Sequence, residues 1–201
     1  NLGITLQSNG MLNEAKEALK KSLVVRPDYV QAYNNLGVIC YELGELDEAI
    51  EAYLTAIKHH KNLGEAHYNL GVVLYEKGHL NEAISSFVKA LQILPNFEPA
   101  YRSIGHALEG IEFNKPQPAI QKILLELLEQ KSVVRPTNIS KAAISLLKLE
   151  PKLKRSLDLS LVINEHTIST IVKNLSEIPL LLQLMKVCPI PDLDIELLLR
   201  K

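Results

Sequence analysis

Apolar and small residues in the first half of the chain recur at helical spacing. Between residues 29 and 43 they fall at i, i+3, i+4 and i+7, which predicts one face of a first helix; the positions are Tyr33, Leu36, Gly37 and Cys40. From residue 46 onward a second set also shares one face, namely Leu46, Ala49, Ile50, Tyr53, Ala56 and Ile57. Gly44 separates the two sets and is expected to end the first helix. The pattern therefore predicts an antiparallel helical hairpin.

This arrangement returns at an interval of 34 residues. The recurring positions are Gly3, Gly37, Gly71 and Gly105; Gly10, Gly44 and Gly78; Leu12, Leu46 and Leu80; Ala15, Ala49 and Ala83; Asn1, Asn35 and Asn69. A fixed period of this length in several residue types indicates stacked hairpins, none of which can bury its apolar face alone. We expect the glycine and alanine columns to mark helix contacts, with Gly37 and Ala49 letting two backbones approach closely.

The repeated columns resemble the tetratricopeptide repeat family, whose hairpins carry a small, large, Gly, large, Ala, aromatic, Ala, Pro pattern. Residues 64–97 match it almost fully, and residues 30–63 match except that Lys61 stands where proline is usual. The resemblance covers residues 1–110: a truncated first repeat at 1–29, complete repeats at 30–63 and 64–97, and a partial fourth at 98–110. It implies an all-α fold in which antiparallel helix pairs form a right-handed superhelix.

Beyond Gly110 the period ends, but helical patterns continue. They predict helices near 116–130, 138–149, 152–163, 166–174, 177–187 and 192–200. We expect residues 111–201 to form a helical cap or a second helical domain that covers the exposed end of the repeat stack. The tract from Ile178 to Leu199 also resembles helical regions that join tetratricopeptide arrays to class I methyltransferase domains in some bacterial proteins. The sequence has no glycine-rich loop for S-adenosylmethionine.

Composition and motifs narrow the classes of function. A formal net charge of −1 lacks the basic excess of nucleic-acid binders, and no apolar run is long enough to span a membrane. Cys40 and Cys188 lie far apart in sequence, which favours a reducing compartment and hence a cytoplasmic protein. No phosphate loop, poised nucleophile or metal-ligand spacing is evident, and the histidines at 59, 60, 67 and 79 have no matching ligands. We therefore expect no catalysis, cofactor, nucleic acid or membrane.

The resemblance implies that the first helices of the hairpins line a concave groove that binds a protein or peptide. Helical geometry places a second set of columns between the packing columns, and these are the candidate groove residues. They are Asn1, Asn34, Asn35, Val38, Tyr41, Glu42, Tyr68, Asn69, Val72, Tyr75, Glu76, Arg102 and His106, with Gln31, Glu65 and Pro99 in the same series.

Asparagine repeats in one of these columns, at Asn1, Asn35 and Asn69, and Ser103 ends the series. An Asn side chain offers both an acceptor and donors, so it can pair with the C=O and the N–H of an extended peptide of any sequence. The column is similar to the asparagine ladder in the tetratricopeptide region of O-linked N-acetylglucosamine transferases. The alternative interpretation is that these side chains are simply solvated.

The other groove residues also leave alternatives open. Tyr41 and Tyr75, with Tyr68 nearby, either contact ligand side chains or bridge neighbouring first helices. Glu42 and Glu76 either favour a basic or neutral peptide or are solvated charges. Glu65 and Asn69 occupy columns where cations would be needed to clamp the carboxylate of a chaperone tail, and Arg102 is the lone basic candidate, so such tails are not expected as ligands.

Three functions follow from these patterns. The leading one is a protein-interaction scaffold that holds an extended peptide. The second is a substrate-recruiting region of a larger methyltransferase or glycosyltransferase, and the third is self-association through the open N-terminal repeat.

Overall fold

The computed structural model describes residues 11–129, 135–159 and 165–187, and all regular elements in these ranges are α-helices. The all-α fold predicted from the sequence is therefore confirmed for the described part of the chain. The chain divides into two compact units, Asn1–Ser103 and Ile104–Lys201, and the division falls within α7 (Glu98–Ala107). The predicted first helix of the first repeat and the predicted helix at 192–200 lie outside the described residues.

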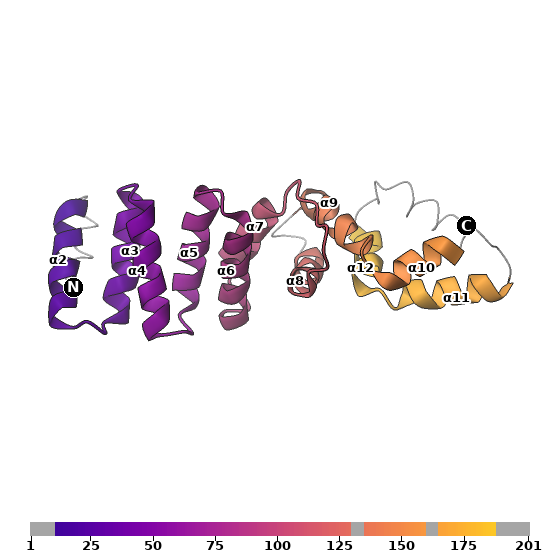
Figure 1. Cartoon of the computed structure of the whole chain (residues 1–201), viewed down its shortest axis with the longest axis horizontal. Coiled ribbons are helices and arrows are strands. Elements are labelled where there is room, and N and C mark those ends of the chain that lie inside the picture. Colours follow the sequence, from indigo (N-terminus) through magenta and orange to yellow (C-terminus); the bar gives the residue numbers. More distant parts are fainter. Residues whose placement is uncertain (1–10, 130–134, 160–164, 188–201) are drawn as a thin grey trace. The chain divides into compact units, whose positions relative to one another are not determined.

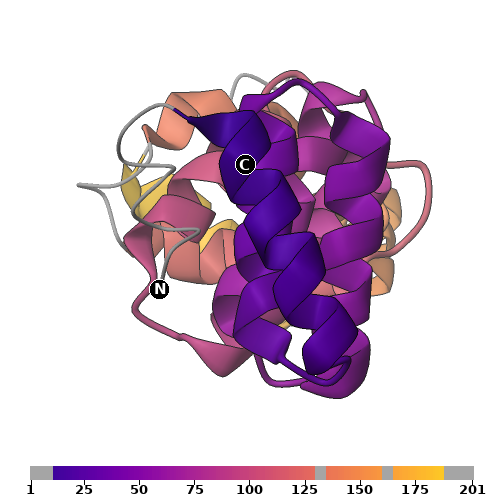
Figure 2. The ribbon, with the colours of Figure 1, turned by 90° about the vertical axis from the view of Figure 1, so that its left-hand side faces the viewer.

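The first unit consists of helical hairpins in sequence order (Figure 1). After α2 (Leu12–Val25), α3 (Val30–Glu42) pairs with α4 (Leu46–His59), and α5 (Gly64–Glu76) pairs with α6 (Leu80–Ile93). Helix α2 also packs against α3, and α4 packs against α5, the first helix of the following hairpin. Figure 2 shows this unit end on, with α2 nearest to the viewer.

Glycine ends both first helices, as the sequence predicts. Gly44 and Gly78 each have φ of +77°, in the left-handed region that favours glycine. The N–H of Gly44 donates to the Tyr41 carbonyl at 2.9 Å, and the N–H of Glu45 donates to the Cys40 carbonyl at 2.8 Å. These two bonds form a Schellman cap, and the same pair recurs after α5. The sharp reversal that starts each second helix is thus built into the backbone.

The alanine and glycine columns pack as seams within the hairpins. Ala49 and Ala83 are fully buried. A Cβ added to Gly37 would lie 2.6 Å from Cε1 of Tyr53. The sequence predicts a close approach to the backbone at Ala49, but the nearest group is the Tyr53 ring. At Gly71 the nearest atoms again belong to an aromatic ring, that of Phe87. The glycines therefore make room chiefly for an aromatic side chain of the second helix.

The second unit contains helices without the 34-residue period. They are α8 (Pro118–Glu129), α9 (Pro136–Leu147), α10 (Pro151–Leu159), α11 (Glu165–Ser176) and α12 (Pro179–Val187). Several begin with proline, whose missing N–H and fixed φ suit the first helical position. Helices α8, α9 and α12 pack together around buried leucines, including Leu124, Leu127, Leu146 and Leu181. No described helix is long and apolar enough to cross a membrane.

Candidate functional site

Apart from Asn34, the candidate groove residues of α3 and α5 keep some exposure, whereas Gly37, Gly71, Ala49 and Ala83 are buried. Half-buried positions are Asn35, Val38 and Tyr41 on α3 and Tyr68, Asn69 and Val72 on α5; exposed positions are Gln31, Glu42, Glu65, Tyr75 and Glu76. The two helices belong to successive hairpins, so equivalent side chains repeat along one surface at an interval of 34 residues. We call these residues the groove face. Asn1 lies outside the described residues.

The asparagines of the groove face differ in their surroundings. Asn34 is buried, with 5% of its surface exposed, whereas Asn35 and Asn69 are only half-buried. The amide nitrogen Nδ2 of Asn69 lies 3.5 Å from Oδ1 of Asn34, which makes a weak contact between α5 and α3. Asn34 is therefore the least accessible of the three to a ligand. Asn35 and Asn69 retain side-chain atoms that a ligand can reach.

Tyr41 connects α3 to α5, because its hydroxyl donates a hydrogen bond to Oε1 of Glu76. This bond, with partial burial, raises the pKa of Tyr41 to about 12, since removing the phenol proton beside a carboxylate is unfavourable. The geometry matches the interpretation in which Tyr41 bridges neighbouring first helices. It also orients the Glu76 carboxylate.

The other two tyrosines of the groove face occupy different environments. The ring of Tyr68 lies 5.7 Å from that of Phe87 and 5.0 Å from that of Phe97, in an edge-on arrangement with the latter. These contacts make Tyr68 part of the core that joins the third hairpin to the segment leading into α7. Tyr75, in contrast, has 41% of its surface exposed and is the more accessible aromatic group.

The two candidates beyond α5 are not equivalent. Arg102 forms an ion pair with Glu98 one turn earlier on α7, with Nη2 and Oε1 at 2.5 Å. Both side chains are more than half exposed, so the pair contributes little stability. His106 is exposed and belongs to the second unit.

A buried lysine is the polar residue that the sequence pattern missed. Nζ of Lys16 on α2 lies 2.5 Å from the Glu45 carboxylate and 2.7 Å from that of Glu48, and Lys16 is only 8% exposed. It occupies the column that holds Ile50 and Ile84 in the next two repeats. The sequence signal for this buried lysine is the exception in that column, where the other two repeats have isoleucine.

The Lys16 partners also approach a metal-like arrangement, because ligand atoms of Cys40, Glu45 and Glu48 lie within 4.8 Å of one another. The Lys16 ammonium already pairs with both carboxylates, and Nζ of Lys20 lies 3.6 Å from that of Glu48. Burial raises the pKa of the Cys40 thiol to about 11, so the thiol is protonated and a poor metal ligand. The cluster is best described as an ion pair that ties α2 to the α3–α4 hairpin.

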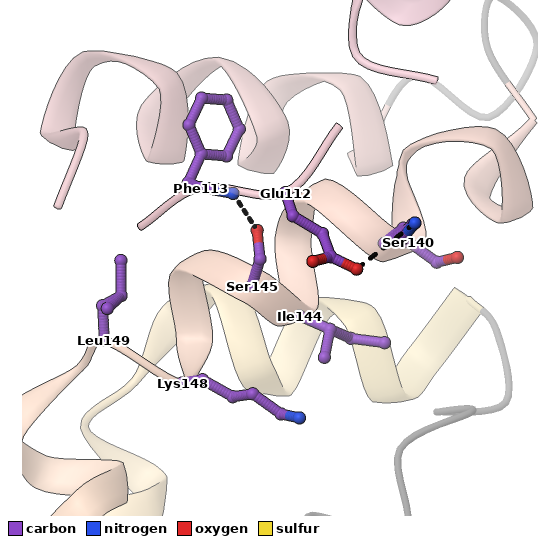
Figure 3. Close-up of a pocket in the computed structure, with 8 residues that line it drawn as sticks. Glu112, Phe113, Ser140, Ile144, Ser145, Lys148 and Leu149 are labelled. Carbon is purple, nitrogen blue, oxygen red and sulfur yellow. Dashed lines mark hydrogen bonds and ion pairs between the residues drawn. The ribbon is translucent and has the colours of Figure 1, made fainter. Parts of the chain in front are cut away.

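The second unit has a hollow of about 530 Å³ between the segment after α7 and helix α9 (Figure 3). The Phe113 N–H donates to Oγ of Ser145 at 2.9 Å, and Lys141 pairs with Glu112 at 3.2 Å. These contacts hold the segment onto α9. A further hollow of about 520 Å³ lies where α8, α10 and α12 begin, and there Lys152 pairs with Glu177 at 2.5 Å. In both hollows, much of the charge is paired internally.

Family models match the repeat region of the chain. A TPR repeat model covers residues 38–78, and a tetratricopeptide repeat model covers residues 64–97. No curated protein sequence matches the chain significantly.

Solved structures provide the remaining comparisons. A crystal structure of MamA is 34% identical over 65% of this chain and 77% of MamA, with a TM-score of 0.55. An O-GlcNAc transferase mutant from Thermobaculum terrenum is 25% identical over 64% of this chain but only 24% of the transferase, with a TM-score of 0.52. A third structure is the first TPR of Spaghetti (RPAP3), bound to the HSP90 peptide SRMEEVD. It is 18% identical over 52% of this chain and 83% of its own length, with a TM-score of 0.52. At this level of identity the match shows the fold alone. The repeat columns, the hairpins and these matches together show that the chain belongs to the tetratricopeptide repeat family.

Proposed function

We propose that this chain is a protein-interaction scaffold whose first unit holds an extended peptide segment of a partner on the groove face. The observation that carries the proposal is the regular placement of accessible Asn35 and Asn69 on successive first helices, while the packing positions Gly37, Gly71, Ala49 and Ala83 are buried. Tetratricopeptide repeats generally act as non-catalytic scaffolds. One solved structure with this fold is named as bound to a peptide, which supports the same class of ligand.

Asn35 and Asn69 supply the chemistry for binding without strict sequence selection. Each amide can accept from a peptide N–H and donate to a peptide C=O, so two asparagines can bind two peptide units. Val38 and Val72 lie one helical turn further along α3 and α5 and offer apolar surface next to each amide. The proposed site therefore combines backbone recognition with small apolar contacts.

The test is a peptide array probed with the whole chain and with an Asn35→Ala/Asn69→Ala double variant. Losing two amide interactions of about 0.5–1.5 kcal/mol each should weaken binding roughly tenfold, because every 1.4 kcal/mol is a factor of ten. The matched control is Asn13→Ala/Asn81→Ala, since both residues are exposed on the second helices α2 and α6. Unchanged binding by a natively folded double variant would refute the role of the asparagines.

A second candidate function is a substrate-recruiting region of a larger enzyme, either a glycosyltransferase or a methyltransferase. The 25% identity to the O-GlcNAc transferase over 64% of this chain supports the glycosyltransferase form. Reading the coding sequence beyond Lys201 tests it, because a nucleotide-sugar or methyl-donor fold there would support this candidate and a stop codon would refute it. Self-association through the first repeat stays a prediction, and sedimentation at increasing protein concentration tests it.

A further inference from the structure

The groove face of the first unit carries carboxylates and has no Lys or Arg of its own. Helices α3 and α5 contain Glu42, Glu65 and Glu76 but neither Lys nor Arg. The Lys and Arg residues between α2 and α6 are confined to the second helices and the connecting loops. The first helices α3 and α5 are therefore acidic although the net charge of the whole chain is close to zero, because the basic residues lie elsewhere in the repeats.

Two of these carboxylates flank the proposed peptide contacts on one face of α5. Glu65 and Glu76 are 11 positions apart. At 100° per residue, this separation returns to within about 20° of the same direction, and at 1.5 Å per residue it spans about 16 Å. Asn69 and Val72 lie between them on the same stripe. The acidic groups are thus placed at both ends of the peptide-contacting surface.

Helix stability does not account for the position of Glu76. It is the last residue of α5, where the partial negative charge of the helix end disfavours a carboxylate. Glu42 holds the same position in α3. The second helix α4, by comparison, has Lys58 and His59 in its last turn, as the helix dipole favours. The helix dipole therefore does not favour Glu76, whose carboxylate instead accepts the hydrogen bond from Tyr41.

Neighbouring side chains orient Glu76 but do not neutralise it. The Tyr41 hydroxyl donates to one of its oxygens. The adjacent cation, Lys77, pairs instead with Asp47 on α4. Within the described ranges, neither Glu65 nor Glu76 forms an ion pair. Both carboxylates are exposed and can therefore receive a cation from a ligand.

An exposed aromatic ring lies next to Glu76 in the sequence. Tyr75 is the repeat equivalent of Tyr41, whose hydroxyl donates to the Glu76 carboxylate. The residue one repeat beyond Glu76 is Gly110, which has no side-chain acceptor for Tyr75. Tyr75 accordingly keeps 41% of its surface exposed. Tyr75 therefore offers an exposed aromatic face on α5, and aromatic faces attract cations.

We propose that the peptide bound by the groove face is basic, with one Lys or Arg paired to Glu76 and another to Glu65. This inference rests on the proposed function, since it names the chemistry of the same ligand. An extended peptide advances about 3.3 Å per residue, so the two cations should be about five residues apart to match the two carboxylates. Negatively charged segments are disfavoured by the same three glutamates.

The test uses arrays of random 12-residue peptides probed with the whole chain, and the probe for affinity is the strongest array binder that carries Lys or Arg. We expect the binding peptides to be enriched in Lys and Arg, with pairs about five residues apart. A Glu65→Gln/Glu76→Gln variant should lose this enrichment and bind the probe about three- to tenfold more weakly, as exposed charge pairs are worth a few-fold each. Added salt should weaken binding more steeply for the unmodified chain than for this variant.

A charge-matched control separates a local effect from a general one. Glu51→Gln/Glu82→Gln removes two exposed carboxylates from the second helices α4 and α6 and should bind the probe as the unmodified chain does. Thermal unfolding gives a readout that does not depend on binding. Glu76→Gln should not lower the unfolding midpoint, because it removes a charge that the helix end disfavours.

The outcomes distinguish this inference from the proposed function. If binding depends on Asn35 and Asn69 but shows no preference for basic peptides, the scaffold proposal stands and the basic ligand is refuted. Enrichment that persists in the Glu65→Gln/Glu76→Gln variant, or is lost equally in the control, also refutes it. If no peptide binds the unmodified chain, both proposals fail.

Discussion

Replacing Gly71 by alanine tests how closely the hairpins are packed. An added Cβ at this position would lie 2.6 Å from Cδ1 and from Cε1 of Phe87 and 3.2 Å from the Ala83 carbonyl oxygen. Favourable carbon–carbon contacts are about 3.5–4.0 Å long, so the ring would have to retreat by about 1 Å. Phe87 is 1% exposed, and the Tyr68 ring lies 5.7 Å from it, so little room is available for that movement.

Two opposing contributions determine the expected result. Alanine is favoured over glycine inside a helix by about 1 kcal/mol. Overpacking of a well-packed core costs about 1–3 kcal/mol, and we expect the upper part of this range because the methyl group meets both a ring and a carbonyl. The Gly71→Ala variant should therefore lose about 1–2 kcal/mol of unfolding free energy, measured by urea denaturation with circular dichroism.

A double-mutant cycle identifies the cause. Phe87→Leu replaces the rigid ring with a smaller side chain that can change rotamer. In that background, Gly71→Ala should be neutral or stabilising, because the helix preference for alanine remains and the clash is relieved. A higher urea midpoint for Gly71→Ala alone, or an equal loss in both backgrounds, would show that the ring does not limit the packing.

Three further predictions concern the hairpins. Ala49→Leu, at a fully buried position, should lower the unfolding free energy by about 1–3 kcal/mol in urea denaturation, and an unchanged curve would contradict the assigned helix seam. Gly44→Ala should cost about 1 kcal/mol despite open space around it, because φ is +77°; equal stability would mean that the turn relaxes. Lys16→Met should leave the thermal midpoint nearly unchanged at pH 7, because the Glu45 and Glu48 carboxylates that lose their partner are partly exposed and can be hydrated, and the other repeats have isoleucine at this position. Lys16 lowers the pKa of Glu48, so the stability contributed by this pair is present above the ordinary Glu pKa and is lost as the pH falls through the lowered value. Acidification below about pH 4.5 should therefore destabilise the unmodified chain relative to Lys16→Met. Parallel pH profiles of the two proteins would contradict the ion pair.

Helix positions in the first unit follow directly from the sequence pattern. The predicted first helix at 29–43 is observed at Val30–Glu42, and Gly44 ends it as expected. These features are local: apolar spacing selects a helix face, and glycine alone adopts a left-handed cap at little cost. They therefore need no knowledge of neighbouring helices.

Contacts between side chains from different helices could not be predicted in the same way. Helical spacing gives the direction of Gly37 but not the group opposite, which is the Tyr53 ring. It also places Asn34 and Asn35 in adjacent columns without showing that Asn34 is buried against α5. Lys16 reaches acceptors 29 and 32 positions away, a pairing set by the depth and tilt of packed helices. The binding roles of the groove face stay a prediction.

The double packing of α4 has a consequence for how the first unit opens. Because α4 contacts α3 on one side and α5 on the other, any fluctuation that detaches it must disrupt two successive repeats together. Ala56 and Ala66, which belong to these different repeats, are both fully shielded from water. Deuterium exchange at the backbone amides of α4 should therefore report the shared opening energy of residues 30–97, and a protease cut in the connection near residue 61 should not release two independently stable halves.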